Sequence, residues 1–205
     1  IQINAFDVTM SNKNTLSKIK IIGGKWKGTN LTFYDEPELR PTGNRIKETL
    51  FNWLQPNIHG SICLDLFAGS GCLGLEALSR GAAKCVMVEK NKRVINHLTK
   101  NIEKLSSSTE LIHDDALNYL SSKEPSKTFD IVFLDPPFDS TIYESTMRTL
   151  ELNHWLSHDA LIYIEARSDS SMFQIPDNWS LFREQVAGNV RYMLYSRREK
   201  KNIQN

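Results

Sequence analysis

The sequence predicts an α/β fold in which helices cover both faces of a mostly parallel sheet. From Ser61 onward, short apolar runs alternate with segments of helical periodicity, an order typical of parallel strands joined by crossover helices. A glycine-rich turn follows the first apolar run, and acidic residues end the next three. Because the carboxyl ends of parallel strands meet at one edge of a sheet, we expect a ligand site there.

The elements of this fold follow one another along the chain. We expect strands at residues 61–66, 84–89, 109–114, 129–135, 160–166, 180–187 and 189–197. We expect helices at residues 71–81, 91–105 and 115–122, and in a region that ends at about His154. The last two strands lie on either side of Gly188, so they predict an antiparallel hairpin.

A smaller segment precedes this alternation. Residues 1–17 are polar and lack periodicity, which predicts a disordered lead. Residues 18–58 contain two β-prone runs, KIKII and TNLTFY, on either side of GGKWKG, so we expect a hairpin there. The run NRIKETLFNWL then predicts a helix with an apolar face made of Ile46, Leu50, Phe51 and Leu54. We therefore expect a small N-terminal extension of a domain that spans residues 59–200.

Composition places limits on the class of protein. The chain has 205 residues and is 40% hydrophobic, which is enough for one ordinary core but short for two full domains. Cys63, Cys72 and Cys85 are odd in number and are not spaced as pairs of metal ligands, so neither a disulfide framework nor a zinc site is suggested. No apolar run approaches the roughly 20 residues that cross a bilayer, and the N-terminus lacks the apolar stretch of a signal peptide. We expect a soluble protein of the reducing cytoplasm.

Basic charge is concentrated near the two ends of the chain. Residues 13–47 hold eight Lys/Arg against three Asp/Glu, and residues 191–201 hold five against one, although the whole chain has a net charge of only +1. A polyanionic partner that approaches from the ends would explain this distribution, and solvation of a mobile tail is the alternative for the last residues.

In the hairpin, Lys25 and Lys27 flank Trp26, a pairing of cations with a stackable ring that suits structured RNA. A buried Trp26 that pins the hairpin to the sheet is the alternative.

The segment LDLFAGSGCLG favours a nucleotide-like ligand. It places Gly69, Gly71 and Gly74 directly after a predicted strand, in the G-x-G-x-x-G spacing of a nucleotide-binding turn. Glu89 ends the next strand, where it could bond ribose hydroxyls, and this pattern alone would also fit a nicotinamide dehydrogenase. Asp65 favours another ligand, because a carboxylate at that strand tip would repel a pyrophosphate but attract the sulfonium and ammonium groups of S-adenosylmethionine. An ordinary strand-end cap is the plainer alternative for Asp65.

Carboxylates also end the third and fourth predicted strands. After the third strand, Asp115 could accept a hydrogen bond from an adenine amino group, although Asp114 or Asp115 could simply cap the next helix. After the fourth strand, the run DPPF combines a carboxylate with two prolines that have no N–H, so this turn presents acceptors only. Such a turn can hold both N–H bonds of an exocyclic base amine and stabilise the positive charge that its nitrogen gains during methyl transfer. Phe138 would stack on the flipped base, and a rigid strand-to-helix turn is the alternative.

The ordered set LDLFAGSGCLG, VEKN, HDDA and LDPPF resembles the motifs of class I methyltransferases that modify amino groups of bases. More specifically, GGKWKG and RPTGNRIKETLFNWL resemble the N-terminal signature of the RsmD family, which methylates N2 of a specific guanine in 16S rRNA. The resemblance covers residues 18–198. It implies a Rossmann-like, mostly parallel seven-stranded sheet with a C-terminal antiparallel hairpin.

The resemblance also implies roles for individual residues. The guanine would be held by Asp135, Pro136 and Phe138. The cofactor, S-adenosylmethionine, would be surrounded by Asp65, Phe67, Gly69, Gly71, Glu89, Lys90, Asp114, Asp115, Ala116 and Asp135. RNA would be met by Arg40, Thr42 and Arg45 over the mouth of the active site, in addition to the hairpin residues Lys25, Trp26 and Lys27 proposed above from their side chains alone. Members of the family are similar in being cytoplasmic monomers, without a metal or a membrane, that act on 16S rRNA in a small-subunit assembly particle.

Other functions stay open at this point. The DPPF turn would serve nearly as well in an adenine-N6 or cytosine-N4 methyltransferase, although the chain lacks the large target-recognition domain of a sequence-specific DNA enzyme. A non-catalytic RNA-binding assembly factor could use the same fold as a platform, but it would need neither the acceptor-only turn nor the glycine loop. A nicotinamide dehydrogenase would leave the DPPF turn unexplained.

Overall fold

The computed structural model describes residues 16–34, 42–105, 107, 109–122, 125–137, 140–170 and 173–198. Its strands are β1 (Leu16–Lys20), β2 (Asn30–Tyr34), β3 (Ile62–Asp65), β4 (Lys84–Glu89), β5 (Thr109–His113), β6 (Phe129–Leu134), β7 (Leu156–Arg167), β8 (Trp179–Ala187) and β9 (Val190–Arg197). Its helices are the 3-10 turn η1 (Gly24–Trp26) and the α-helices α1 (Asn44–Leu54), α2 (Cys72–Ser79), α3 (Lys92–Leu105), α4 (Ala116–Ser122) and α5 (Ser140–Leu152).

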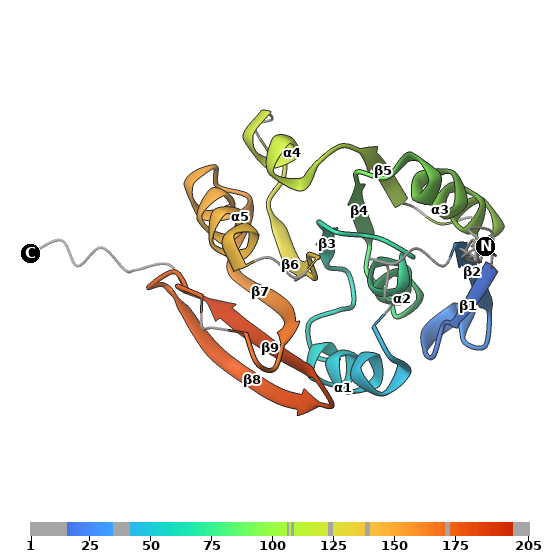
Figure 1. Ribbon diagram of the computed structural model, residues 1–205, viewed down its shortest axis with the longest axis horizontal. Coiled ribbons are helices and arrows are strands. Elements are labelled where there is room, and N and C mark those ends of the chain that lie inside the picture. Colours follow the sequence, from blue (N-terminus) through green and yellow to red (C-terminus); the bar gives the residue numbers. More distant parts are fainter. Residues whose placement is uncertain are drawn as a thin grey trace, which may run out of the picture.

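The main sheet has seven strands in the order β5-β4-β3-β6-β7-β9-β8 (Figure 1). Strands β3 to β7 pair in parallel, whereas β9 pairs antiparallel with both β7 and β8. The predicted α/β fold with a C-terminal antiparallel hairpin is therefore confirmed. The chain winds outward from β3 through β4 and β5, and it then returns to place β6 on the other side of β3. In doubly wound sheets this reversal opens a crevice beyond the carboxyl ends of the strands, where ligands bind.

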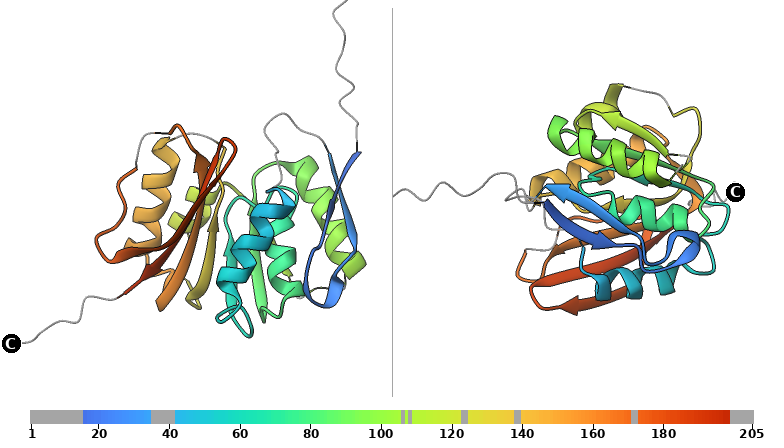
Figure 2. Two further views of the ribbon diagram at one scale, coloured as in Figure 1. Left: turned by 90° about the horizontal axis from the view of Figure 1, so that it is seen from below. Right: turned by 90° about the vertical axis from the view of Figure 1, so that its right-hand side faces the viewer.

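Helices cover both faces of the sheet (Figure 2). Helices α1, α2 and α3 share one apolar cluster, and α4 and α5 share the other. Neighbouring residues of a strand belong to different clusters, as Cys63 and Leu64 of β3 do, because successive side chains point to opposite faces. The central strands are consequently buried on both sides, which explains why they appear in the sequence as continuous apolar runs.

The N-terminal hairpin is attached to the same core. Strands β1 and β2 form their own two-stranded sheet beside α2 and α3, and Ile21 and Leu31 join the apolar cluster of those helices (Figure 2). The strand begins at Leu16 rather than at Lys18, and residues 1–15, which carry most of the predicted disordered lead, lie outside the described residues. Helix α1 occupies the predicted run with its apolar face buried, but it also buries a lysine, which periodicity did not predict.

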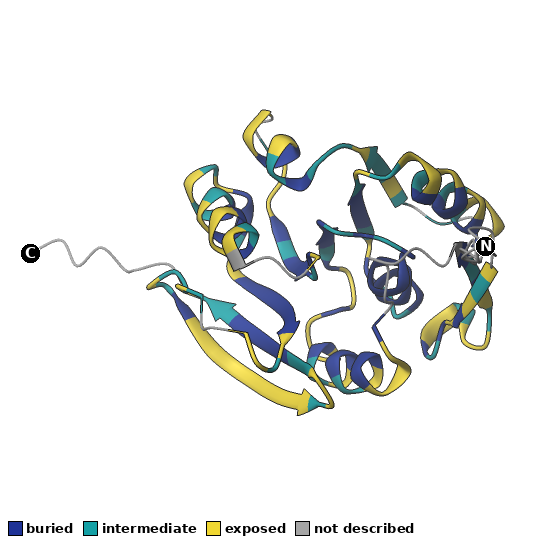
Figure 3. Cartoon of the chain, viewed as in Figure 1, coloured by how far each residue is buried: buried dark blue, intermediate teal, exposed yellow. Residues whose placement is uncertain are grey.

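The edge strand β8 differs from the rest of the sheet, because most of its residues are exposed (Figure 3). Its partner β9 is buried over its middle residues and closes the core on that side.

None of the described helices is long and apolar enough to cross a membrane.

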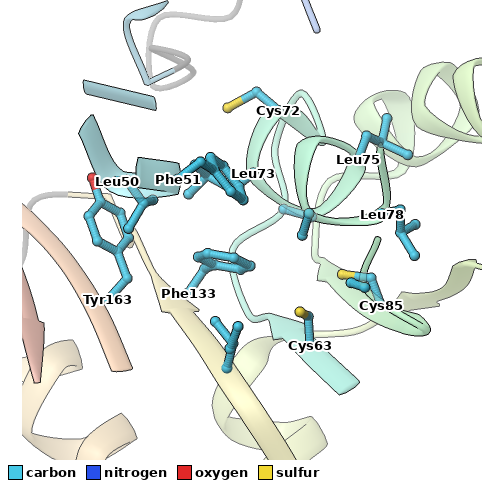
Figure 4. Close-up of a cluster of buried hydrophobic side chains, with 14 of the residues drawn as sticks. Leu50, Phe51, Cys63, Cys72, Leu73, Leu75, Leu78, Cys85, Phe133 and Tyr163 are labelled. Carbon is cyan, nitrogen blue, oxygen red and sulfur yellow. The ribbon is translucent and has the colours of Figure 1, made fainter. Parts of the chain in front are cut away.

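All three cysteines are buried and free, and they lie in the cluster between α2 and the sheet (Figure 4). Cys63 and Cys85 are paired in register on β3 and β4, and Cys72 begins α2. Burial raises the pKa of the Cys63 thiol to about 12 and that of Cys72 to about 11. These thiols are protonated at neutral pH, so they serve as packing groups rather than as nucleophiles.

Candidate active site

A cavity of about 650 Å³ lies at the carboxyl edge of the sheet. The ends of the five parallel strands and the start of α1 form its walls. Eleven of the residues proposed from the sequence line it: Thr42, Asp65, Phe67, Gly69, Glu89, Lys90, Asp114, Asp115, Ala116, Asp135 and Pro136. Motifs that are far apart in the chain thus meet at one site, where the strand order reverses.

The glycine loop and the acidic end of β4 are joined by hydrogen bonds. Gly69 has a φ of 50° and its N–H donates to Glu89 Oε2 at 2.9 Å. Glu89 Oε1 accepts the N–H of Asn91 at 2.7 Å, so the carboxylate fixes the loops after both β3 and β4. Each carboxylate oxygen has a second lone pair, so Glu89 can still accept ligand hydroxyls from the cavity that it lines.

The other two glycines of the motif serve the backbone rather than the cavity. Gly71 has a φ of 77° at the N-cap of α2, and a side chain there would clash with Leu98 of α3. A side chain at Gly74 would clash with Met87, because α2 lies directly on the sheet at that point. Gly71 does not line the cavity, so the structure does not place it among the groups that could touch a cofactor. At position 71, only glycine tolerates both the positive φ and the close approach of Leu98.

Asp65 is a buried carboxyl at the end of β3. It is 2% exposed, yet it lines the cavity, and its Oδ2 accepts the N–H of Gly74 at 3.1 Å. Burial raises its pKa to about 7, although backbone hydrogen bonds from Gly74 and Phe67 oppose the rise. A cation in the cavity would favour its ionised form.

The acidic pair after β5 combines capping with access to the cavity. Asp115 Oδ1 accepts the N–H groups of Leu117 at 2.9 Å and Asn118 at 3.4 Å, which is the N-cap arrangement of α4. Asp114 Oδ1 accepts the N–H of Asp115 at 2.8 Å. Both aspartates line the cavity, so the capping role and a ligand-binding role are compatible.

Asp135 meets a second carboxyl that the sequence analysis did not propose. Leu134 and Ile164 are register partners on β6 and β7, so Asp135, which directly follows β6, lies beside Glu165, which is near the end of β7. Burial, followed by the charge of Glu165, raises the pKa of Asp135 well above its ordinary value. Burial also raises the pKa of Glu165. Thr42 lies next to both, because its hydroxyl donates to Glu165 Oε2 at 3.2 Å and its side chain opposes the rise in the pKa of Asp135.

Comparison with known proteins bears on this arrangement. A family model described as "Conserved hypothetical protein 95" matches residues 19–196. Ribosomal RNA small subunit methyltransferase D of Escherichia coli K12 is 46% identical over 187 residues, which are 91% of this chain and 93% of that protein. The chain belongs to the RsmD family.

Two further relatives agree with this membership. The protein of the same name in Haemophilus influenzae is 46% identical over 185 residues, which cover 89% of this chain and 95% of that one. A solved structure described as "Putative methyltransferase yhhF from Escherichia coli" is 43% identical and has a TM-score of 0.83, and the match covers 90% of this chain and all of that one. The predicted family and the methyltransferase fold are thus confirmed, and the chain is a methyltransferase.

Several cavity residues were not proposed from the sequence. Glu165, Arg167 and Asn189 lie outside the quoted motifs, on β7 and in the turn of the C-terminal hairpin. Ile46 and Cys72 lie within the motifs, at the starts of helices, but as apolar or small residues they gave no sign of a ligand contact. One signal was present in the sequence, since an acidic residue near the end of an apolar run, as in ALIYIEA, repeats the pattern of the preceding strands. That signal indicates only that Glu165 lies at the edge of the sheet. Its position beside Asp135 depends on the order of the strands, which the signal does not give.

The predicted RNA-contacting residues are divided between different places. Thr42 is 1% exposed and lies in the cavity wall rather than on the surface, while Arg45 is exposed on the first turn of α1. Arg40 and Phe138 lie outside the described residues. Gly43 and Ile46 line the cavity, so the exposed Arg45 lies in the chain between two residues of the cavity wall.

The hairpin tip with Lys25, Trp26 and Lys27 is not brought to the cavity. The backbone N–H of Trp26 donates to Ser79 Oγ at 3.0 Å, and Ser79 is the last residue of α2, whereas the cavity lies at the first. Trp26 is partly buried against the core, and Lys25 Nζ lies 4.1 Å from the centre of its ring. The ring therefore pins the hairpin, and the two lysines remain exposed at the opposite edge of the sheet.

Proposed function

We propose that this protein transfers a methyl group from S-adenosylmethionine to the exocyclic N2 of a guanine in 16S rRNA. The observation that carries the proposal is the meeting of three carboxyls with the proline turn in one cavity: the buried Asp65 and Glu165, and the partly exposed Asp135. In the described residues, none of these carboxyls forms an ion pair with Lys or Arg. Such a cavity favours a ligand that brings positive charge and hydrogen-bond donors.

The fit of S-adenosylmethionine rests on the chemistry of these donors and acceptors. When bound, this cofactor supplies an electrophilic methyl group on a sulfonium, together with an ammonium group. Asp65 would be held ionised by that charge, Glu89 would accept from ribose hydroxyls, and the residues after β5 would border the adenine. Gly69 lines the cavity without a side chain, which suits close contact of its backbone with a nucleoside.

The proline turn would act on the amine. The Asp135 carboxylate and the Pro136 carbonyl can each accept one N–H of an exocyclic amine, which orients the nitrogen for attack. The carboxylate stabilises the positive charge that the nitrogen gains. Its raised pKa also suits it to take up the proton that the amine then loses.

The choice of ribosomal RNA rests on the relatives, two of which are named ribosomal RNA small subunit methyltransferase D. We propose a small-subunit assembly particle as the substrate, which would place the reaction in the cytoplasm, and a monomer as the active form. A metal is not part of the proposal. Among the residues that the structure describes, no group of His, Cys, Asp and Glu could hold one.

The direct test is methyl transfer from radiolabelled S-adenosylmethionine to small ribosomal subunits from cells that lack the endogenous enzyme. Nuclease digestion would then identify the labelled nucleoside. N2-methylguanosine in 16S rRNA is the expected product. Methyladenosine or methylcytidine would keep the enzyme class and refute the guanine assignment. Measurable cofactor binding without label on the subunits would favour a non-catalytic role or another substrate.

The roles within the site are tested by two variants. Asp135→Ala should abolish turnover and leave the affinity for S-adenosylhomocysteine within a few-fold, because it removes a group that acts on the amine. Glu89→Ala should mainly weaken cofactor binding, because it removes the acceptor and loosens the glycine loop. Calorimetric titration and single-turnover rates separate the two effects. Equal losses of cofactor affinity in both variants would contradict this division of roles.

A further inference from the structure

Glu165 is a cavity residue to which the proposed reaction assigns no role. It lies near the end of β7, is 6% exposed, and lines the cavity beside Asp135. Its carboxyl accepts the hydroxyl of Tyr163 at 2.7 Å and that of Thr42 at 3.2 Å. Both of these hydrogen bonds end on Oε2. A carboxylate has about four acceptor positions on its two oxygens, so most of its capacity, including Oε1, remains for a ligand.

Even with these two hydroxyl donors, the ionised form of this carboxyl is costly to bury unless a cation or a further donor meets it. Burial is the largest cause that raises the pKa of Glu165, and the nearest cavity arginine, Arg167, pairs instead with Asp169 at 2.8 Å. Two tyrosine hydroxyls hold the residue in place, since Tyr143 donates to its backbone carbonyl at 2.7 Å in addition to the bond from Tyr163. The carboxyl is therefore fixed by hydrogen bonds on the cavity wall, and no Lys or Arg of the described residues forms an ion pair with it.

The bases with exocyclic amines differ in what lies beside the amine. Guanine carries an N1–H next to its N2 amine, so these two neighbouring groups are both donors. Adenine carries a bare N1 next to its N6 amine, and cytosine carries a bare N3 next to its N4 amine, so each of these edges presents a donor and an acceptor. Donors from a ligand favour the ionised forms of both carboxyls, and in that state Asp135, Pro136 and Glu165 together form a wall of acceptors. An adenine or cytosine in the same position would direct a ring lone pair at the second carboxylate.

We propose that Glu165 determines base specificity by accepting the N1–H of the target guanine while Asp135 holds the N2 amine. This inference rests on the proposed function and deepens it, since the same cavity would otherwise serve several amino-methyltransferases. Glu165 recognises the neighbouring ring nitrogen and does not act on the reacting amine. Sites built to hydrogen-bond a substrate group reject analogues that lack it far more strongly than apolar pockets do.

The test uses 2-aminopurine, which keeps the amine at C2 but carries a bare N1. Small subunits are reconstituted with ligated rRNA that holds guanine or 2-aminopurine at the modified position, and kcat/KM is measured for both. Wild-type enzyme should prefer guanine by about 10- to 100-fold or more, as expected when one charged hydrogen bond is lost. Equal rates on the two substrates would overturn the proposal without any variant.

Glu165→Gln should then reduce the preference for guanine by about tenfold or more, because its amide can donate to the bare N1 of 2-aminopurine. The change in preference is the readout, since 2-aminopurine also lacks the guanine O6 and that difference acts equally on both enzymes. Tyr163→Phe is the matched control, because it removes a hydrogen bond to the same carboxyl and keeps the carboxylate. It should slow both substrates by the same factor.

The outcomes separate this inference from the proposed function. Wild-type enzyme that makes no N2-methylguanosine on the guanine substrate would overturn both. Wild-type activity with an unchanged preference in Glu165→Gln would overturn the role of Glu165 and leave the proposed function standing. Affinity for S-adenosylhomocysteine, measured on each variant, shows that the cavity is intact.

Discussion

Replacement of Lys47 by methionine should destabilise the protein, although this residue lies outside the cavity. Lys47 is 1% exposed, and its Nζ donates to the Lys20 carbonyl at 2.8 Å and lies 4.0 Å from Glu76 Oε2. Glu76 is fully buried and also accepts the backbone N–H of Ile22 at 2.9 Å and the Nε of Arg80 at 2.8 Å. This network connects the hairpin, α1 and α2.

The magnitude follows from the groups that lose a partner. Breaking a buried ion pair costs about 3–5 kcal/mol, but the separation of 4.0 Å and the remaining bond from Arg80 place this case lower. The Lys20 carbonyl also loses its donor, at a cost of about 1 kcal/mol at a partly buried site. Relief of the buried ammonium, whose pKa is lowered chiefly by burial, offsets part of the loss. We expect a net loss of roughly 2–3 kcal/mol in the free energy of unfolding.

Urea unfolding monitored by tryptophan fluorescence measures this loss. The melting temperature should also fall by about 2–4 °C for each kcal/mol. Lys100→Met, an identical change at an exposed position of α3, is the control and should stay within about 0.5 kcal/mol of wild type. The double variant Lys47→Met, Glu76→Gln should regain at least about 1 kcal/mol over the sum of the single losses. Wild-type stability in Lys47→Met, or strict additivity in the double variant, would refute the network.

Three further predictions concern pH, the glycine loop and salt. The pKa of Asp65 is raised to about 7 in the fold, so the stability that this residue contributes is complete below its unfolded pKa of 3.8 and is lost as the pH rises through 7. In urea unfolding measured as a function of pH, Asp65→Asn should reduce this decline in the free energy of unfolding by up to about 1.4 kcal/mol per pH unit. Gly71→Ala should lower the free energy of unfolding by about 1–3 kcal/mol and weaken binding of S-adenosylhomocysteine, because the φ of 77° and the nearby Leu98 exclude a side chain. Unchanged cofactor affinity in calorimetry would show that the loop does not depend on this glycine. If the RNA reaches the far edge of the sheet, neutralising Lys25 and Lys27 together should reduce the slope of the logarithm of the RNA binding constant against the logarithm of salt concentration by about 1–2. An identical slope would mean that the hairpin has a structural role.

Some features of this protein could be predicted from the sequence because they depend on local chain geometry. Strand and helix periods recur over a few residues, so the order of elements and the apolar face of α1 were readable before any tertiary contact was known. Parallel strands put their carboxyl ends on one edge, so the glycine loop, Glu89, Asp115 and Asp135 could be assigned to one site. The roles of these residues remain proposals.

Other features were decided by tertiary structure, because they join positions that no local pattern connects. Thr42 and Glu165 are 123 residues apart and meet only because β7 lies beside β6 and the start of α1 closes over both. The helical pattern of α1 gives no sign that Lys47 is buried. Its burial is possible because its ammonium group meets the Lys20 carbonyl of the hairpin and lies near Glu76. The sequence also suggested that the Lys25 to Lys27 tip meets RNA, but packing on the far end of α2 sets it away from the cavity. Periodicity shows which face of an element is buried, whereas only the packing of elements decides which groups from distant parts of the chain come into contact.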